Sequence, residues 1–396
     1  MNKKLVALAI AGAVALPLGA QAQTAQVTLY GRANVDLEFV KGQQPDGSNN
    51  TVTRVNSNSS RFGLRGTESL GGGLTAFFQV ENSVNWDGNP QLSGAAANAG
   101  TIANRETFVG LQGNFGQIWL GRALSPYDDT TVPWAPNVFN YNTGIMATST
   151  MFGNTAQGGG NPVSGSYDDR YSNSIRWNSA TMAGFTAEVQ YAVLENQKNG
   201  YALIPAIFYN NGPIQASAAW AHHDKLRCYA ATGLSYASCS NGPSNGSTAG
   251  LYAAKDDAYT VAFSYDFRVV RLAAHYEYLK YNTPGGDLTR ESYGVTGIIP
   301  LGGGNVYLYY GNAGDGKGGA SDLTPRINSL AHGSDTGMQM YEIGYSYFLS
   351  KRTQVNAGYV NVNNKSRANY TFNVNGYSVA TGGDPQGLVF GLIHNF

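Results

Sequence analysis

Charged side chains recur at alternate positions within strand-like segments of this sequence. In residues 27–39, Arg32, Asp36 and Glu38 fall on one parity, and the other parity is wholly apolar. Fixed guanidinium and carboxylate groups on one face of a strand catalyse nothing by themselves. Across water they create a field that orients passing dipoles and separates anions from cations. We therefore expect these charged side chains to act through their electric field rather than by catalysis.

Other residue types that could do chemistry lack the necessary partners. Gly311 to Lys317 resembles a phosphate-binding loop, but Gly318 stands where serine or threonine is required. No serine can be connected to a histidine from the sequence, so an enzymatic barrel is a weak alternative. The histidines show no metal-ligand spacing with carboxylates or cysteines: His222, His223, His275, His332 and His394. We expect no catalytic residue, no metal and no cofactor.

Strand-like segments come in pairs, each joined by a tight turn and separated from the next by a longer polar loop. Seven turns and eight loops connect sixteen strands. The turns lie at 71–73, 114–116, 179–184, 210–212, near Arg268, 301–305 and 349–351. The loops lie at about 40–59, 87–104, 124–169, 195–200, 224–256, 282–289, 313–336 and 363–385. In a membrane barrel the turns would be periplasmic and the loops external.

Alternation alone does not separate a membrane barrel from a soluble sandwich. Three features favour the barrel. The strands are about ten residues long, as a tilted bilayer crossing requires, tyrosines gather near strand ends, and the chain ends inside a strand at Phe396. We therefore predict an all-β, sixteen-stranded antiparallel transmembrane barrel. Three side chains fit it poorly, because Glu68, Glu106 and Arg122 fall on the outward parity, where a subunit interface could accommodate them.

The two ends of the chain predict export. Lys3 and Lys4 precede an apolar run and then Ala20-Gln21-Ala22, so residues 1–22 form a signal peptide that is cleaved, and residues 23–396 form a single barrel domain.

The composition is typical of turns and aromatic strands, because the sequence contains Gly 51 times and Tyr 26 times and only 13% of its residues are charged. Removal of the leader gives a formal net charge of −2, which does not suggest a nucleic-acid partner. Cys228 and Cys239, in an external loop, are expected to form a disulfide.

Several fragments resemble the general diffusion porins of Gram-negative outer membranes. They are residues 27–33, 60–66, 108–111 with 120–122, 170–175, and the terminal Phe396. The resemblance implies a trimer of sixteen-stranded barrels, in which the long third loop folds into the lumen and forms a narrow eyelet. It also implies a basic wall facing acidic groups on the loop. The residues implied for the wall are Arg32, Arg61, Arg105 and Arg170.

The residues themselves support this assignment. A charged side chain that faces lipid at mid-bilayer costs about 2–4 kcal/mol, so arginines in mid-strand belong in a water-filled lumen. Residues 124–169 are the longest connection, and their aromatic content indicates that they pack against something, for which the barrel interior is the obvious place. Asp128 and Asp129 in this loop are the candidates for the acidic side, with Glu81 as a further one.

The expected function is a water-filled outer-membrane channel for passive diffusion of ions and small hydrophilic solutes, with a weak preference for anions. A substrate-specific channel for a small anionic or sugar solute is the alternative. The expected partners are two further copies of the chain in a homotrimer, outer-membrane lipid, and the barrel-assembly machinery, which would read the C-terminal strand and its Phe396.

Overall fold

The computed structural model describes residues 26–88, 102–135, 144–155, 165–193, 200–230, 236–238, 251–374 and 376–396. The predicted leader, residues 1–22, and Cys239 of the predicted disulfide lie outside the described residues. No helix among the described residues is long and apolar enough to cross a membrane.

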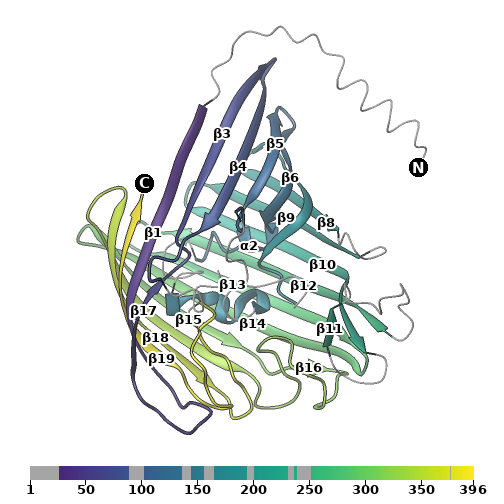
Figure 1. Cartoon of the computed structure of the whole chain (residues 1–396), viewed down its shortest axis with the longest axis vertical. Coiled ribbons are helices and arrows are strands. Elements are labelled where there is room, and N and C mark those ends of the chain that lie inside the picture. Colours follow the sequence, from purple (N-terminus) through teal and green to yellow (C-terminus); the bar gives the residue numbers. More distant parts are fainter. Residues whose placement is uncertain are drawn as a thin grey trace.

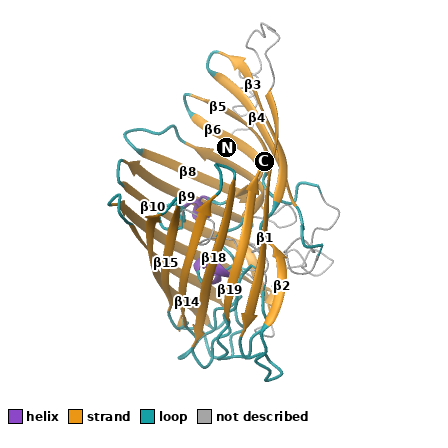
Figure 2. Cartoon of the chain, turned by 90° about the vertical axis from the view of Figure 1, so that its left-hand side faces the viewer, coloured by secondary structure: helices purple, strands orange, loops and turns teal. Residues whose placement is uncertain are grey.

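Sixteen antiparallel strands close into a barrel (Figures 1 and 2). The first eight wall strands are β1 (Gln26–Lys41), β2 with β3 (Val52–Ser57 and Arg61–Gly71), β4 (Leu74–Ser83), β5 (Thr107–Gly113), β6 (Gly116–Leu124), β7 (Arg170–Asn178), β8 (Phe185–Val193) and β9 (Tyr201–Asn211). The other eight are β10 (Ile214–Ala230), β12 (Leu251–Asp266), β13 (Arg271–Thr283), β14 (Gly286–Leu301), β15 (Gly304–Ala313), β17 (Met338–Phe348), β18 (Thr353–Asn364) and β19 (Gln386–Asn395). The predicted strand count and the seven turns are confirmed.

Two very short strands and four helical turns lie outside the wall strands. The short strands are β11 (Tyr236–Ser238) and β16 (Lys317–Gly318). The helical turns all belong to the third loop: α2 (Pro126–Asp129), η2 (Gly144–Met146), η3 (Thr148–Thr150) and η4 (Phe152–Asn154). Both views place these turns within the outline of the barrel (Figures 1 and 2).

Some predicted loop limits were too wide. The loop expected at about 40–59 begins after Lys41, and β2 pairs with β1 from Val52 onward. Likewise β10 runs on to Ala230, and β12 begins at Leu251. The strands continue past the predicted span because hydrogen bonding between neighbouring strands does not end where apolar alternation ends.

Alternation along each strand sorts the side chains between the two faces of the wall. On β12, Val261 is 52% exposed whereas Thr260 is 2% exposed, and on β13 Leu272 is exposed whereas Glu277 is buried. The exposed side chains form an apolar outer belt, and the buried charged side chains lie on the inner face among alanine, tyrosine and other apolar residues. The charged groups are therefore kept from the outer surface, as expected for a wall between lipid and water.

Glu106 corrects one prediction, because it lies on the inner face. Its carbonyl accepts a hydrogen bond from the Glu81 N–H, so the two residues sit opposite each other. The neighbouring Phe108 stacks on the buried Trp119, with ring centroids 5.4 Å apart, while Val109 is exposed. This part of the interior therefore holds a cluster of aromatic rings beside the charged side chains.

The barrel closes where the last strand meets the first. β19 pairs with β1 over ten positions, from Arg32 with Asn395 to Lys41 with Gln386. Phe396 continues the ladder, because its N–H donates to the Gly31 carbonyl at 3.0 Å and its carbonyl accepts from the Gly31 N–H at 2.9 Å. A Cβ atom on Gly31 would lie 2.1 Å from the Phe396 ring. The ring therefore covers the glycine, and the closure needs both residues.

We predict that Gly31→Val weakens the closure by about 1–3 kcal/mol, the usual cost of overpacking a filled site. The measurement is the fraction of protein that migrates as the compact folded form in electrophoresis without heating. Gly297→Val is the matched control, since a Cβ atom there has no neighbour closer than 3.9 Å. Equal folded fractions for the two variants would contradict the role of the Phe396 ring.

Candidate functional site

The four predicted wall arginines lie together on the inner face of the barrel. Arg32 on β1 is opposite Arg61 on β3, and their guanidinium groups are close enough to repel each other. Arg105 is repelled in turn by Arg61 and by Arg170. We call these four residues the arginine cluster. Like charges held this close concentrate positive potential on one part of the wall.

Glu81 lies within the arginine cluster. Its Oε1 accepts a hydrogen bond from Arg105 Nε at 2.6 Å and lies 3.6 Å from Arg61 Nη1. Its Oε2 accepts a hydrogen bond from the Tyr30 hydroxyl at 3.1 Å. The predicted acidic residue therefore offsets part of the positive charge from the same side of the barrel and positions two of the arginines.

Several guanidinium N–H groups in the arginine cluster have no protein acceptor. Arg32 Nε and Nη2 and Arg170 Nε are buried without a hydrogen-bond partner among the described residues. A donor left without an acceptor is costly, and a charged one is more so. These donors are therefore suited to interact with an anion that passes the wall.

The two loop aspartates lie in the first helical turn of the third loop. Ser125 caps α2, because its Oγ accepts a hydrogen bond from the Asp128 N–H at 3.1 Å. Asp129 forms an ion pair with Arg176 on β7, and Arg176 also lies 2.6 Å from Glu188 on β8. Asp129 thus pairs with an arginine outside the arginine cluster, one that sequence reasoning missed.

Two acidic residues beside the cluster were also missed as candidates. Asp36 and Glu38 are buried on the inner face of β1, on the same parity as Arg32. Glu38 accepts from Arg54 Nε at 2.7 Å, and Asp36 accepts a hydrogen bond from the Asn58 side chain. The alternation in residues 27–39 already placed both side chains on the same face as Arg32, so the sequence was sufficient to predict them as residues of this site.

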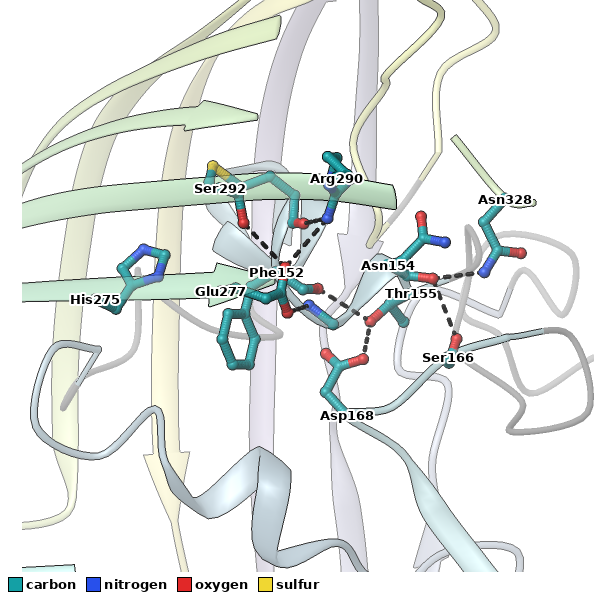
Figure 3. A network of polar contacts seen from close by, with 12 residues as sticks. Phe152, Asn154, Thr155, Ser166, Asp168, His275, Glu277, Arg290, Ser292 and Asn328 are labelled. Carbon is teal, nitrogen blue, oxygen red and sulfur yellow. Dashed lines mark hydrogen bonds and ion pairs between the residues drawn. The ribbon is translucent and has the colours of Figure 1, made fainter. Parts of the chain in front are cut away.

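The described parts of the third loop are held by one buried carboxylate, Glu277 on β13 (Figure 3). Its Oε1 accepts from the Tyr127 hydroxyl at 2.8 Å and from the Gly153 N–H at 2.6 Å. Its Oε2 accepts from Ser292 at 3.0 Å and lies 3.2 Å from Arg290 on β14. Burial raises the pKa of Tyr127 well above its ordinary value, so its hydroxyl stays protonated and donates.

Further contacts fix the same loop at several points of the inner face. Trp134 stacks on His275 with ring centroids 3.8 Å apart. Asn154 donates to the Tyr281 hydroxyl at 2.9 Å, and the Asn373 N–H donates to Thr150 Oγ1 at 3.1 Å. These anchors come from widely separated strands and loops, so the loop is attached on several sides.

Comparisons with known proteins agree with this geometry. The family model described as Gram-negative porin matches residues 7–367. Outer membrane porin protein 32 of Delftia acidovorans is 29% identical over the whole of both chains. An outer membrane porin protein of Bordetella pertussis is 30% identical over 90% of this chain and 93% of its own. Among solved structures, an anion-selective porin from Comamonas acidovorans matches with a TM-score of 0.69 and 25% identity, covering 94% of this chain and 100% of its own.

We predict that Tyr127→Phe lowers the free energy of unfolding by roughly 1.5–3 kcal/mol, because a buried carboxylate loses a hydrogen-bond donor. Guanidinium unfolding followed by tryptophan fluorescence measures it. Tyr191→Phe is the control, since Tyr191 is an exposed tyrosine on β8 whose hydroxyl makes no hydrogen bond within the described residues. Identical unfolding curves for Tyr127→Phe and the unmodified protein would show that Glu277 does not anchor the loop.

Proposed function

The chain belongs to the Gram-negative porin family and is an outer-membrane protein, and from this premise we propose how its interior selects what passes. The barrel is a water-filled channel for ions and small hydrophilic solutes, and the arginine cluster gives it a weak preference for anions. The relatives are channels rather than enzymes, and we assign no catalytic role to any residue of this chain.

The arginine cluster carries this proposal. Four guanidinium groups lie together on one part of the inner face, and Glu81 has a hydrogen bond or an ion-pair distance to two of them. Asp36 also attracts Arg32, and Asp169 attracts Arg170 and Arg105, yet Arg32 Nε and Nη2 have no hydrogen-bond partner among the described residues. We infer that these unpaired cationic donors favour anions along the path beside this wall. The solved relative from Comamonas acidovorans is itself described as anion-selective.

The third loop would set the narrowest part of the channel. Most of its described residues are buried, and Glu277 on the wall is the central anchor. A loop held at several points inside a barrel reduces the cross-section available to water. We assign Asp128 and Asp129 to the acidic side of the constriction, where Asp129 also orients Arg176.

The remaining sequence assignments belong to the same proposal. Residues 1–22 direct export and are removed, and residues 23–396 form the barrel. The aromatic C-terminus, Phe396, is the signal read by the assembly machinery, and the mature protein assembles as a homotrimer in outer-membrane lipid. The outward-facing Glu68, opposite Ala76 on β4, supports an interface between subunits at the first strands, since a carboxylate there is costly against lipid.

We predict that Arg32→Ala lowers the anion-to-cation permeability ratio by about twofold. One unit charge about 10 Å from the ion path in water changes the energy of an anion by roughly 0.4 kcal/mol and that of a cation by the same amount in the opposite direction. Screening by about 0.1 M salt reduces the combined effect on the ratio to about twofold. Reversal potentials in planar bilayers under a salt gradient measure the ratio. Arg326→Ala, in the seventh loop, is the matched control, because Arg326 donates to Asn369 far from the cluster. A ratio that stays at the unmodified value in Arg32→Ala would contradict the proposed role of the wall.

A pH dependence follows from Asp169, which lies in the third loop directly before β7. Burial raises its pKa to about 6, against the attraction of Arg170. As the pH falls through about 6, Asp169 loses its negative charge beside Arg170 and Arg105, so the anion preference rises. We predict that Asp169→Asn shows the higher preference at neutral pH and no step near pH 6. The pH dependence of the reversal potential tests this, and an unchanged step in Asp169→Asn would refute it.

A further inference from the structure

An apolar groove of about 730 Å³ lies on the outer surface of the wall, over β12, β13, β14, β15, β17 and β18. Its lining includes two neighbouring cross-strand rows. One row runs from Phe263 through Ala274 and Val295 to Tyr310, and the next contains Leu272 and Gly297. The small residues Ala274 and Gly297 lie between large ones, which leaves a depression in the belt.

Gly297 differs from other outward-facing glycines of the described wall. A Cβ atom on Gly31 would lie 2.1 Å from the Phe396 ring, and one on Gly66 would lie 2.4 Å from the Phe78 ring. A Cβ atom on Gly297 would meet only Leu308 at 3.9 Å and Leu272 at 4.0 Å. Aromatic rings of the chain therefore cover Gly31 and Gly66, whereas the space above Gly297 is open to whatever surrounds the barrel.

Positive charge marks the nearby rim of the barrel. The groove reaches Phe267, and the turn that follows carries the exposed Arg268. The turn between β17 and β18 carries the exposed Lys351 and Arg352. The other five short turns, all within the described residues, contain no lysine or arginine. The cations of this rim are therefore gathered beside the groove.

The height of the groove on the barrel wall indicates which kind of molecule would occupy it. Gly297 lies four residues before the end of β14 at Leu301, so the groove belongs to the half of the wall near the short turns. In an outer-membrane barrel that half faces the periplasmic leaflet, which consists of glycerophospholipid. A second copy of the chain is less suited to this face, because the outward Glu68 that needs cover lies on β3, six wall strands away from β14.

We propose that this groove binds an acyl chain of a glycerophospholipid, whose phosphate is held at the rim by Arg268, while Lys351 and Arg352, farther along the same rim, add to its positive potential. An acyl chain matches the apolar lining, which is continuous with the lipid-facing belt. An anionic phosphate matches the cations, which attract it most strongly at low ionic strength. The groove does not involve the channel interior, so this proposal can fail without affecting the ion selectivity proposed above.

The test uses the full mature chain refolded into vesicles of phosphatidylethanolamine and phosphatidylglycerol and then transferred to a mild detergent. Native mass spectrometry counts the phospholipid molecules retained by each chain. We expect the unmodified protein to retain one. Gly297→Leu fills the groove and should lower retention by about tenfold. Replacing Arg268, Lys351 and Arg352 together by glutamine should lower it as well.

Matched controls separate the site from general lipid adhesion. Ala187→Leu adds three of the four carbon atoms that Gly297→Leu adds, at a half-buried position on the outward parity of β8, and Lys41→Gln removes an exposed cation at the other end of the barrel. Both should retain lipid as the unmodified protein does, and electrophoretic mobility without heating verifies that every variant folds. Retention by Gly297→Leu equal to that of the unmodified protein would overturn the proposal. Loss of a multimer in Gly297→Leu with retained lipid would also overturn it, and would show an interface between copies.

Discussion

The structure depends on one constraint, which is that every backbone hydrogen bond within the membrane must be made by the protein. Hydrocarbon offers no partner to a free N–H or carbonyl, so a sheet can span it only as a closed ring. The ten paired positions between β1 and β19, extended by the bonds between Gly31 and Phe396, supply that closure. Closure also creates the interior, in which charged side chains escape the cost of facing lipid.

In the closed ring, the outer and inner faces of the wall have different environments and different roles. Outward residues such as Val261 and Leu272 are exposed to lipid, and inward residues such as Glu277 and Arg290 are fully buried. A buried ion pair is costly to break and adds little net stability by itself. Glu277 also accepts bonds from Tyr127 and Gly153, so this pair holds a loop in place as well as satisfying its own charge.

Alternation along the strands made the barrel, its turns and the inward direction of Arg32 and Arg61 predictable from the sequence. The partner of Asp129 was not predictable, because the direction of a loop side chain follows from how the loop packs and has no period of its own. Arg176 is one inward arginine among several, and only the packed structure pairs it with Asp129. Glu106 was assigned to the outward parity, whereas the pairing of β4 with β5 places it opposite Glu81 on the inner face.

The central claim is that the closed barrel encloses a continuous water-filled path in each of three subunits. Single-channel recording of the unmodified, folded protein in planar bilayers tests this most directly. The account predicts stepwise ohmic conductance that rises with salt concentration and closes in three equal levels. Folded protein that inserts into the bilayer and gives no conductance would contradict the claim, because the interior would then be sealed.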